Sequence, residues 1–306
     1  MKDNYIVIGS RGSKLALAQT GLIRAALSKN FPQLKIDVRI IKTTGDKILD
    51  TPLAKIGDKG LFTKELEEAL LAVEIDLAVH SMKDLPTELP DGLEIGAVSA
   101  REEACDVLVS REAFTINNLP QGAKVGTSSL RRRAQVLALR QDLEVLDLRG
   151  NLDTRLAKLN SGRYDAIILA YAGIKRLGLD LNMSKLSFDE MLPQAGQGAL
   201  GIEIRKNDLD VCNLINVLDD NDSRLSTEAE RALLAGLGGG CQVPIGVYAR
   251  IEGGKIAIKA GVFSLDGKRA IKDETAGDKK DALRLGKELA QALLKKGAKE
   301  ILDEII

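Results

Sequence analysis

Short apolar runs alternate with stretches of helical periodicity up to about residue 210, and this alternation constrains the fold more than any other feature of the sequence. It predicts strands at Tyr5 to Ile8, Lys35 to Ile41, Asp76 to Val79, Asp106 to Val109, Lys124 to Val125, Leu143 to Leu148 and Ala166 to Ala170. It predicts helices from Ser13, at Leu61 to Val73, from Ser129 and at Leu152 to Leu159. Such alternation is typical of an α/β protein with mainly parallel sheets, here in two successive layers.

A different pattern begins near residue 220 and predicts a small C-terminal α+β domain. A helix at Thr227 to Leu234 ends in a glycine-rich stretch, and strands are predicted at Val247 to Ile251, Lys255 to Ser264 and Lys268 to Thr275. The turn residues between these strands favour hairpins, so they should form an antiparallel three-stranded sheet. The run Ala199 to Ile204 predicts one more strand, and periodicity leaves open which α/β layer it joins.

The charge balance and the shortage of aromatic and histidine residues exclude several classes of protein. The 306 residues include 44 basic and 44 acidic side chains, so no net positive field attracts nucleic acid. Aromatic residues make up 3% and there is no Trp, so the stacking platforms of single-strand binders are missing. His80 is the only histidine, which excludes His-rich zinc sites, and no metal is expected.

The cysteines and the apolar runs bear on the compartment. Cys105, Cys212 and Cys241 are an odd number without a CxxC pair, which favours a reducing environment and a cytoplasmic protein. The N-terminus lacks the apolar stretch of a signal peptide. The longest uncharged apolar run, Ala166 to Ile174, is far shorter than the roughly 18 residues of a membrane span, so no membrane partner is expected.

Three loops share one design, in which a strand runs into small or hydroxylic residues, then a basic residue, then a helix. They are Gly9 to Lys14 with Arg11 and Ser13, Gly126 to Arg133 with Thr127, Ser128, Ser129, Arg131 and Arg132, and Leu148 to Asn151 with Arg149, followed by Arg155. Helix N-termini, hydroxyl groups and guanidinium groups together bind anions. Several arginine loops suit a ligand with many carboxylates better than a single phosphate, and none fits a nucleotide-binding fingerprint.

A simpler interpretation of these loops is that the hydroxyl side chains cap helices and the arginines form surface ion pairs with neighbouring acids. That interpretation is favoured for one such loop taken alone. Three such loops at strand ends favour a binding site, because ligands of open α/β sheets bind beyond the carboxyl ends of the strands.

Asp84 is the candidate catalytic carboxylate because it follows the predicted strand Asp76 to Val79 and stands beside Lys83. An ionised carboxylate among cations can stabilise a cationic intermediate and transfer a proton. The alternative is that Asp84 only caps the turn before Pro86. His80 is expected to be packed against the sheet rather than catalytic.

Cys241 is the candidate nucleophile or attachment point among the three cysteines. It lies in an irregular loop between glycines and Pro244, where a thiol can be approached. Cys105 and Cys212 are explained as small buried apolar residues.

Several long motifs resemble one known family, the porphobilinogen deaminases, also called hydroxymethylbilane synthases. The resemblance covers essentially the whole chain and is carried by Ile8 to Gln19, Gly57 to Phe62, Val79 to Asp84, Gly126 to Arg132, Leu148 to Asn151 and Gly239 to Gly246. It implies three domains, of which the first two are similar to the lobes of a periplasmic binding protein. Domain 1 would comprise residues 1–100 with 197–218, domain 2 residues 101–196 and domain 3 residues 219–306, so that Ala199 to Ile204 returns to the first lobe.

The resemblance also implies a transferase of porphyrin and heme biosynthesis. Enzymes of this family join four porphobilinogen molecules head to tail with release of ammonia, then release linear hydroxymethylbilane by hydrolysis. The chain grows on a dipyrromethane cofactor, which would be attached to Cys241 through a thioether. The rival hypothesis is a non-catalytic two-lobed anion-binding protein, which would need neither Asp84 nor Cys241. A monomer is expected in either case.

The residue-wise match assigns roles to the basic and hydroxylic residues. Asp84 would be catalytic and would stabilise the azafulvene cation. Cofactor carboxylates would be held by Ser13, Lys83, Ser129, Arg131 and Arg132. Incoming substrate would be bound by Arg11, Arg149 and Arg155, with Thr127, Ser128, Lys59 and Arg176 in the same site. The chain departs from the family pattern at Gln194, where Ala is usual, and at 218–222, where the family often has histidine; we expect effects on packing only.

Overall fold

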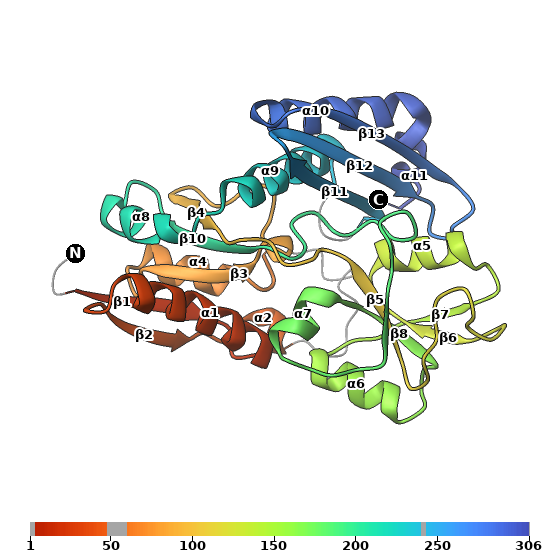
Figure 1. Ribbon diagram of the computed structural model, residues 1–306, viewed down its shortest axis with the longest axis horizontal. Coiled ribbons are helices and arrows are strands. Elements are labelled where there is room, and N and C mark those ends of the chain that lie inside the picture. The colour runs from red at the N-terminus through yellow and green to blue at the C-terminus, as the bar shows by residue number, and fades with distance from the viewer. Residues whose placement is uncertain (1–3, 48–59, 240–242, 306) are drawn as a thin grey trace.

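Three β-sheets organise the part of the chain that the structure describes, residues 4–47, 60–239 and 243–305 of a computed structural model (Figure 1). Two five-stranded sheets with helices form two lobes that lie side by side in Figure 1, and a three-stranded sheet with its helices lies above them. The predicted fold class, α/β lobes with a small C-terminal α+β domain, is confirmed.

The first lobe is built on a sheet in which four of five strands run in the same direction. The strands in spatial order are β2 (Lys35–Ile40), β1 (Tyr5–Ser10), β3 (Leu77–Ser81), β10 (Leu200–Arg205) and β4 (Leu93–Val98). β1 pairs in parallel with β2 and β3, whereas β10 is antiparallel to β3 and to β4. The helices of this lobe are α1 (Lys14–Asn30), α2 (Thr44–Lys47), α4 (Lys64–Leu71) and α8 (Leu209–Ile215).

The second lobe repeats this arrangement without repeating the sequence. Its strands in spatial order are β7 (Glu144–Leu146), β6 (Lys124–Gly126), β8 (Ala166–Ala170), β5 (Asp106–Ser110) and β9 (Met183–Lys185). Here β5 is the reversed strand, antiparallel to β8 and to β9. The helices are α5 (Leu130–Leu139), α6 (Leu152–Asn160) and α7 (Tyr171–Arg176).

The two reversed strands are those that directly follow a passage of the chain between the lobes. β5 begins after residues 99–105 have left β4, and β10 begins after residues 186–199 have left β9. β10 lies between β3 and β4, so the strand that periodicity could not assign belongs to the first sheet. Two covalent connections therefore run side by side between the lobes.

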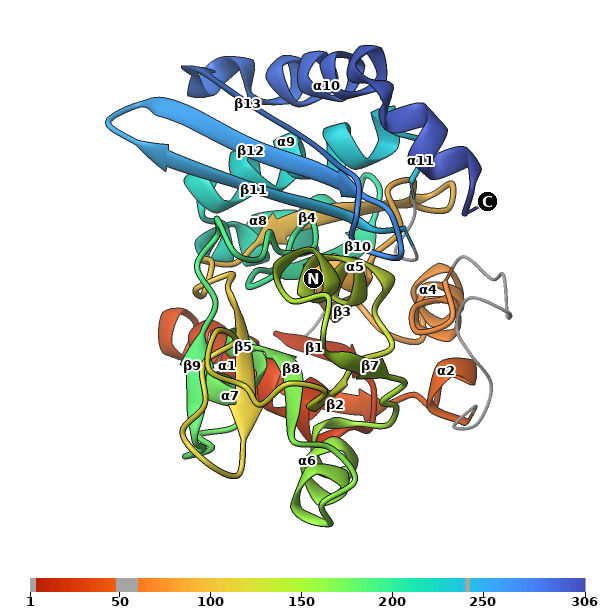
Figure 2. The same ribbon diagram turned by 90° about the vertical axis from the view of Figure 1, so that its right-hand side faces the viewer.

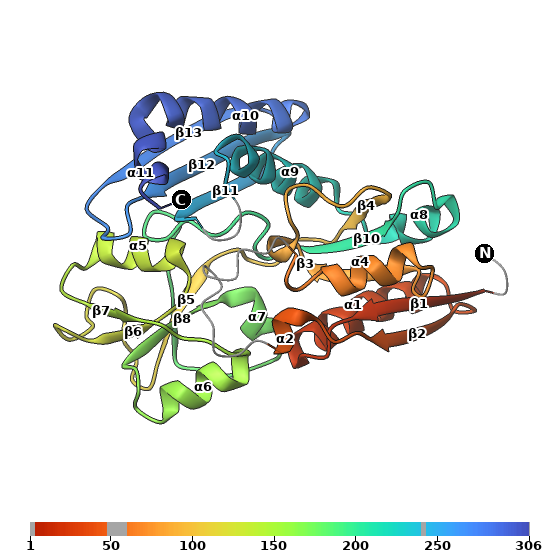
Figure 3. The ribbon, with the colours of Figure 1, turned by 180° about the vertical axis from the view of Figure 1, so that it is seen from behind.

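The third domain is an antiparallel sheet covered on one face by helices. β11 (Ile245–Glu252), β12 (Lys255–Phe263) and β13 (Ala270–Asp278) are neighbours in sequence order, as predicted. α9 (Asn221–Gly236) and α10 (Ala282–Leu293) pack against each other and against this sheet (Figure 2), and α11 (Lys299–Asp303) follows. Figure 3 shows α9 between the three-stranded sheet and the first lobe, where it contacts β4.

The sequence did not predict β4, β9, α2, α7 or α8. β9 has three residues and α7 has six, which is too short for a periodic pattern to emerge. The glycine Gly96 interrupts the apolar pattern of β4, because Ile204 and Ile215 fill the space where a side chain would stand. None of the described helices combines the length and apolar character that crossing a membrane requires.

The contact between α9 and α10 depends on a residue without a side chain, Gly286. A Cβ atom at this position would stand 2.2 Å from the carbonyl oxygen of Ala229 in α9. We expect Gly286→Ala to lower the free energy of unfolding of the third domain by about 1–3 kcal/mol, as overpacking does, measured by urea denaturation.

Gly21 in the exposed face of α1 is the matched control, because a Cβ there meets no atom within 4 Å. Gly21→Ala should raise the free energy of unfolding by about 0.5–1 kcal/mol, since alanine favours helix. Equal stability of the two variants would contradict the proposed close contact.

Candidate active site

The start of α5 places two arginines at the edge of the second lobe. Ser129 is the N-cap residue, and its hydroxyl oxygen accepts a hydrogen bond from the backbone N–H of Arg132 at 3.4 Å. The hydroxyl oxygen of Thr127 accepts from the backbone N–H of Ser129 at 3.2 Å. These contacts stop the strand and start the helix, so that Arg131 and Arg132 lie in its first turn.

Both arginines bind one buried carboxylate, Asp106 at the start of β5. Nη1 of Arg131 lies 2.8 Å from Oδ2 of Asp106, and Nη2 of Arg132 lies 2.7 Å from Oδ1. Burial alone would raise the pKa of Asp106, but the two guanidinium groups hold it well below its usual range. Two cations share one carboxylate, so this buried group keeps a surplus positive charge.

Lys83 adds a further positive charge, and a glutamine that bridges the lobes links it to Asp106. Its Nζ donates to Oε1 of Gln197 at 3.1 Å, and Nε2 of Gln197 donates to Oδ1 of Asp106 at 3.0 Å and to the carbonyl oxygen of Ala104 at 2.7 Å. Burial, and after it the charge of Arg132, lower the pKa of Lys83 to about 8. A bound anion would stabilise the charged form of Lys83.

Asp84 lies among these cations. It is the last residue of η1 (Met82–Asp84), a one-turn 3-10 helix that follows β3. Burial, and after it Arg132, lower the pKa of Arg155 to about 10, and the charge of Asp84 opposes this shift, as it does for Lys83. The carboxylate is therefore within electrostatic range of a lysine from its own lobe and an arginine from the other. Arg149 also lies within range of Arg155.

The residues that meet at this place come from both lobes and from the connection between them. We call them the inter-lobe cluster: Lys83, Asp84, Asp106, Arg131, Arg132, Arg149, Arg155 and Gln197.

The third arginine loop is shaped by its own side chains. Asn151 caps α6 by accepting from the backbone N–H of Thr154 at 2.9 Å, and Gly150 adopts a φ of 110°, which a side chain would disfavour. Nε of Arg155 donates to the carbonyl oxygen of Gly150 at 2.8 Å. This bond fixes the stem of Arg155 while its charge acts on the cluster.

The first loop lies at the matching edge of the first sheet. Ser13 caps α1 by accepting from the backbone N–H of Ala16 at 3.2 Å, and the guanidinium of Arg11 lies 4.2 Å from the ring centroid of Phe62. β1 and β3 are parallel neighbours, so this loop and the Lys83–Asp84 segment leave the sheet at the same edge. Ser13 and Ser129 cap helices, as the simpler interpretation predicts, and Asn151 does so too. The arginines of these loops still belong to the candidate site.

The remaining candidates differ in how they are placed. Thr127 is buried, and the hydroxyl oxygen of Ser128 is buried with no partner among the described residues. Arg176 donates to the carbonyl oxygen of Gly198, so it holds the connection between the lobes. Lys59 and Cys241 lie outside the described residues.

Sequence reasoning missed Asp106 and Gln197 as parts of the site. The sequence predicts Asp106 only as the first residue of a strand; the available signal is an acidic residue at the start of an apolar strand in a chain with an arginine-rich helix start. Gln197 gave no signal, because its role depends on the fold alone. The prediction for His80 is confirmed: it is buried, and its Nε2 lies 3.0 Å from Oε2 of Glu203 on β10.

The fold and the cluster together define a class of protein. This is a two-lobed α/β protein with a third domain, whose lobes meet around cations in excess and two carboxylates, Asp84 and Asp106. Within the described ranges no group of histidine, cysteine, aspartate and glutamate side chains is placed to hold a metal ion.

Comparison with known proteins identifies the family. The family model "Porphobilinogen deaminase, dipyromethane cofactor binding domain" matches residues 6–213, and "Porphobilinogen deaminase, C-terminal domain" matches residues 225–295. The porphobilinogen deaminase of Chloroherpeton thalassium is 53% identical, with 98% of this chain and 97% of that protein covered. That of Syntrophobacter fumaroxidans is 50% identical, with 100% and 99% covered. The chain belongs to the porphobilinogen deaminase family.

Membership in this family makes the protein an enzyme, a transferase, and the hypothesis of a non-catalytic anion-binding protein is not supported. Among solved structures, the periplasmic aliphatic sulphonate binding protein SsuA from Escherichia coli matches at a TM-score of 0.40 and 16% identity, covering 76% of this chain and 70% of that chain.

The residues present fit a dipyrromethane cofactor, which the name of the first family model specifies. Two buried polar atoms of the α5 loop, the hydroxyl oxygen of Ser128 and Nε of Arg131, have no partner in the described part of the chain. Buried donors without partners are costly, and carboxylate oxygens would satisfy them. The surplus positive charge around Asp106 points to the same kind of ligand.

We expect the stability of the second lobe to depend on Asp106. Asp106→Asn leaves two buried guanidinium groups without a counter-ion, and should lower the free energy of unfolding by about 3–5 kcal/mol, measured by urea denaturation. Asp142→Asn is the control, because Asp142 pairs with Arg140 at the surface and its loss should change stability little. Similar unfolding midpoints for the two variants would show that the buried ion cluster does not support the fold.

Proposed function

We propose that the inter-lobe cluster is the active site of a hydroxymethylbilane synthase. In this reaction four porphobilinogen molecules are joined head to tail, each with loss of ammonia, and linear hydroxymethylbilane is then released by hydrolysis. Every added unit brings an acetate and a propionate group. The observation that carries the proposal is the position of one carboxylate, Asp84, among cations supplied by both lobes.

Asp84 would act as the catalytic carboxylate. Loss of ammonia leaves a cation delocalised over the pyrrole ring of the substrate, and a fixed negative charge beside the ring stabilises that cation. The same oxygen atoms can accept and return a proton. The surrounding cations hold the substrate carboxylates away from Asp84.

Two groups of side chains would divide the remaining work. Ser13, Lys83, Ser129, Arg131 and Arg132 would hold the carboxylates of the cofactor. Arg11, Arg149 and Arg155 would bind the incoming substrate, with Thr127, Ser128, Arg176 and Lys59 around them. When bound, the dipyrromethane would supply the pyrrole carbon to which the first unit is joined, and each later unit would be joined to the unit before it.

Cys241 would carry the cofactor through a thioether, and its described neighbours support this. Gly246 in β11 approaches Leu192 so closely that a Cβ atom would lie 2.5 Å from the Cβ of Leu192. The carbonyl oxygen of Leu192 accepts from Nη1 of Arg131 at 2.6 Å. The chain that follows Cys241 thus passes beside the residues proposed to bind the cofactor.

The charge of Asp84 can be tested without changing its shape. Asp84→Asn should lower the rate of ammonia release by roughly 100- to 10,000-fold, the range that general acid–base catalysis contributes. The melting temperature should stay close to that of the parent. Asp91→Asn, an exposed aspartate of the same lobe, should keep the parental rate. Turnover of Asp84→Asn near the parental rate would exclude the proposed role.

The attachment at Cys241 can be tested by the mass of the denatured protein. The parent should carry the extra mass of two linked pyrrole units, and Cys241→Ser should not. A parent with only its polypeptide mass should gain the extra mass on incubation with porphobilinogen. Extra mass on Cys241→Ser would place the attachment elsewhere.

We further propose domain boundaries at residues 1–100 with 197–218, 101–196 and 219–306. The two passages between the lobes and the start of α9 support these positions. A cytoplasmic monomer that binds no nucleic acid agrees with the zero net charge and the unpaired cysteine pattern.

A further inference from the structure

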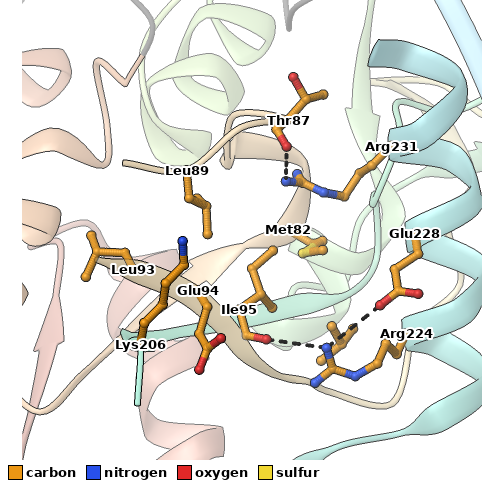
Figure 4. A pocket seen from close by; sticks show the side chains of 11 residues that line it. Met82, Thr87, Leu89, Leu93, Glu94, Ile95, Lys206, Arg224, Glu228 and Arg231 are labelled. Atoms are coloured by element: carbon orange, nitrogen blue, oxygen red, sulfur yellow. Dashed lines mark hydrogen bonds and ion pairs between the residues drawn. The ribbon is translucent and has the colours of Figure 1, made fainter. Parts of the chain in front are cut away.

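The backbone that follows Asp84 is held by a side chain from another domain. Nη1 of Arg231 donates to the carbonyl oxygen of Leu85 at 3.2 Å, and its Nη2 donates to those of Pro86 at 2.6 Å and Thr87 at 3.2 Å. Arg231 belongs to α9 in the third domain, and Figure 4 shows it reaching across to Thr87. One guanidinium group thus binds three successive carbonyl groups directly after the candidate catalytic residue.

We propose that Arg231 is a positioning residue that sets the place of the Asp84 carboxylate from the third domain. This inference rests on the proposed catalytic role of Asp84. Arg231 acts on the backbone only and touches none of the reacting groups.

The segment around Asp84 needs external support because it has little hydrogen bonding of its own. η1 is a single turn closed by one bond, from the backbone N–H of Leu85 to the carbonyl oxygen of Met82 at 3.3 Å. Before Asp84, the backbone N–H of Met82 donates to the carbonyl oxygen of Ala199 at 3.0 Å. Nε2 of Gln194 donates to the carbonyl oxygen of Lys83, also at 3.0 Å. Arg231 provides the corresponding support after Asp84.

A cavity beside this segment leaves it room to move if the guanidinium group is removed. The cavity has a volume of about 340 Å³ and is lined by Met82, Thr87, Leu89 and Arg231 among others (Figure 4). Leu85 is buried, whereas Thr87 and Leu89 line the cavity, so packing alone does not hold residues 87–89 in place. A displacement of about 1 Å at a reacting group can lower the rate by as much as 100-fold.

A second arginine on α9 provides the matched control. Arg224 lies two turns before Arg231 and lines the same cavity. It donates to the carbonyl oxygens of Ile95 and Gly96 in β4 and pairs with Asp219 at 2.7 Å. Arg224 therefore also fastens α9 to the first lobe, at a place away from Asp84.

The experiment compares Arg231→Gln, Arg231→Lys and Arg224→Gln as holoenzymes whose cofactor content is verified by mass. For Arg231→Gln we expect kcat to fall about 10- to 100-fold while KM stays within about twofold. Arg231→Lys should recover part of kcat, because an ammonium group can still donate to these carbonyls. Arg224→Gln should keep the parental kcat even where its melting temperature falls.

The dependence on Asp84 is tested by combining Arg231→Gln with Asp84→Glu. If Arg231 acts through Asp84, the two losses in kcat will not multiply, because the displaced carboxylate is already out of place. Arg231→Lys, which keeps a positive charge at this position of α9, gives a second measurement should Arg231→Gln fail to fold.

Several outcomes would overturn the inference. The first is a parental kcat for Arg231→Gln. The second is an equal loss of kcat in Arg231→Gln and Arg224→Gln that follows the fall in melting temperature. The third is a loss of kcat in Arg231→Gln that multiplies with the loss caused by Asp84→Glu. These results are distinct from failure of the proposed function, which requires Asp84→Asn itself to turn over at the parental rate.

Discussion

The buried pairing of Asp106 with Arg131 and Arg132 is the interaction on which the arrangement of the site depends. Asp106 is the first residue of the strand that enters the second lobe, and Gln197, on the return connection, donates to the same carboxylate. Both passages of the chain are thus joined to one ion cluster. Because the arginines lie at the start of a capped helix, the cluster also sets where α5 begins relative to the sheet.

The same cluster explains why the protein is suited to a ligand with many carboxylates. Burying two guanidinium groups with one carboxylate carries a large desolvation cost, which complete pairing would offset. Burial and the charge of Arg132 lower the pKa of both Lys83 and Arg155, so these two nearby positive charges also carry a desolvation and repulsion cost. A bound polycarboxylate would relieve this repulsion, so the ligand and the fold stabilise each other.

Sequence reasoning found the elements whose signal is local and missed the contacts that only the fold creates. The bounds of the strand Ala166–Ala170 were predicted correctly, and a charged residue, Asp165, precedes the apolar run that forms it. Ser13 and Ser129 were found because helix caps depend on the next three residues alone. Gln197 meets Asp106 across 91 positions and Lys83 across 114 positions, and no periodic pattern encodes such contacts. The sequence motifs indicated roles for the arginines. Only the structure shows that Arg131 and Arg132 share the carboxylate of Asp106.

The place of β10 in the first sheet has a consequence for the order in which the chain can fold during synthesis. β10 lies between β3 and β4, so β4 has no neighbour in its sheet until residues 200–205 have been made. The strands of the second sheet are all contained in residues 106–185. The second lobe can therefore close while the first is still incomplete, and the N-terminal lobe is the later one to finish. For the two lobes, the order in which the sheets can be completed is therefore the reverse of the order in which their first strands are made.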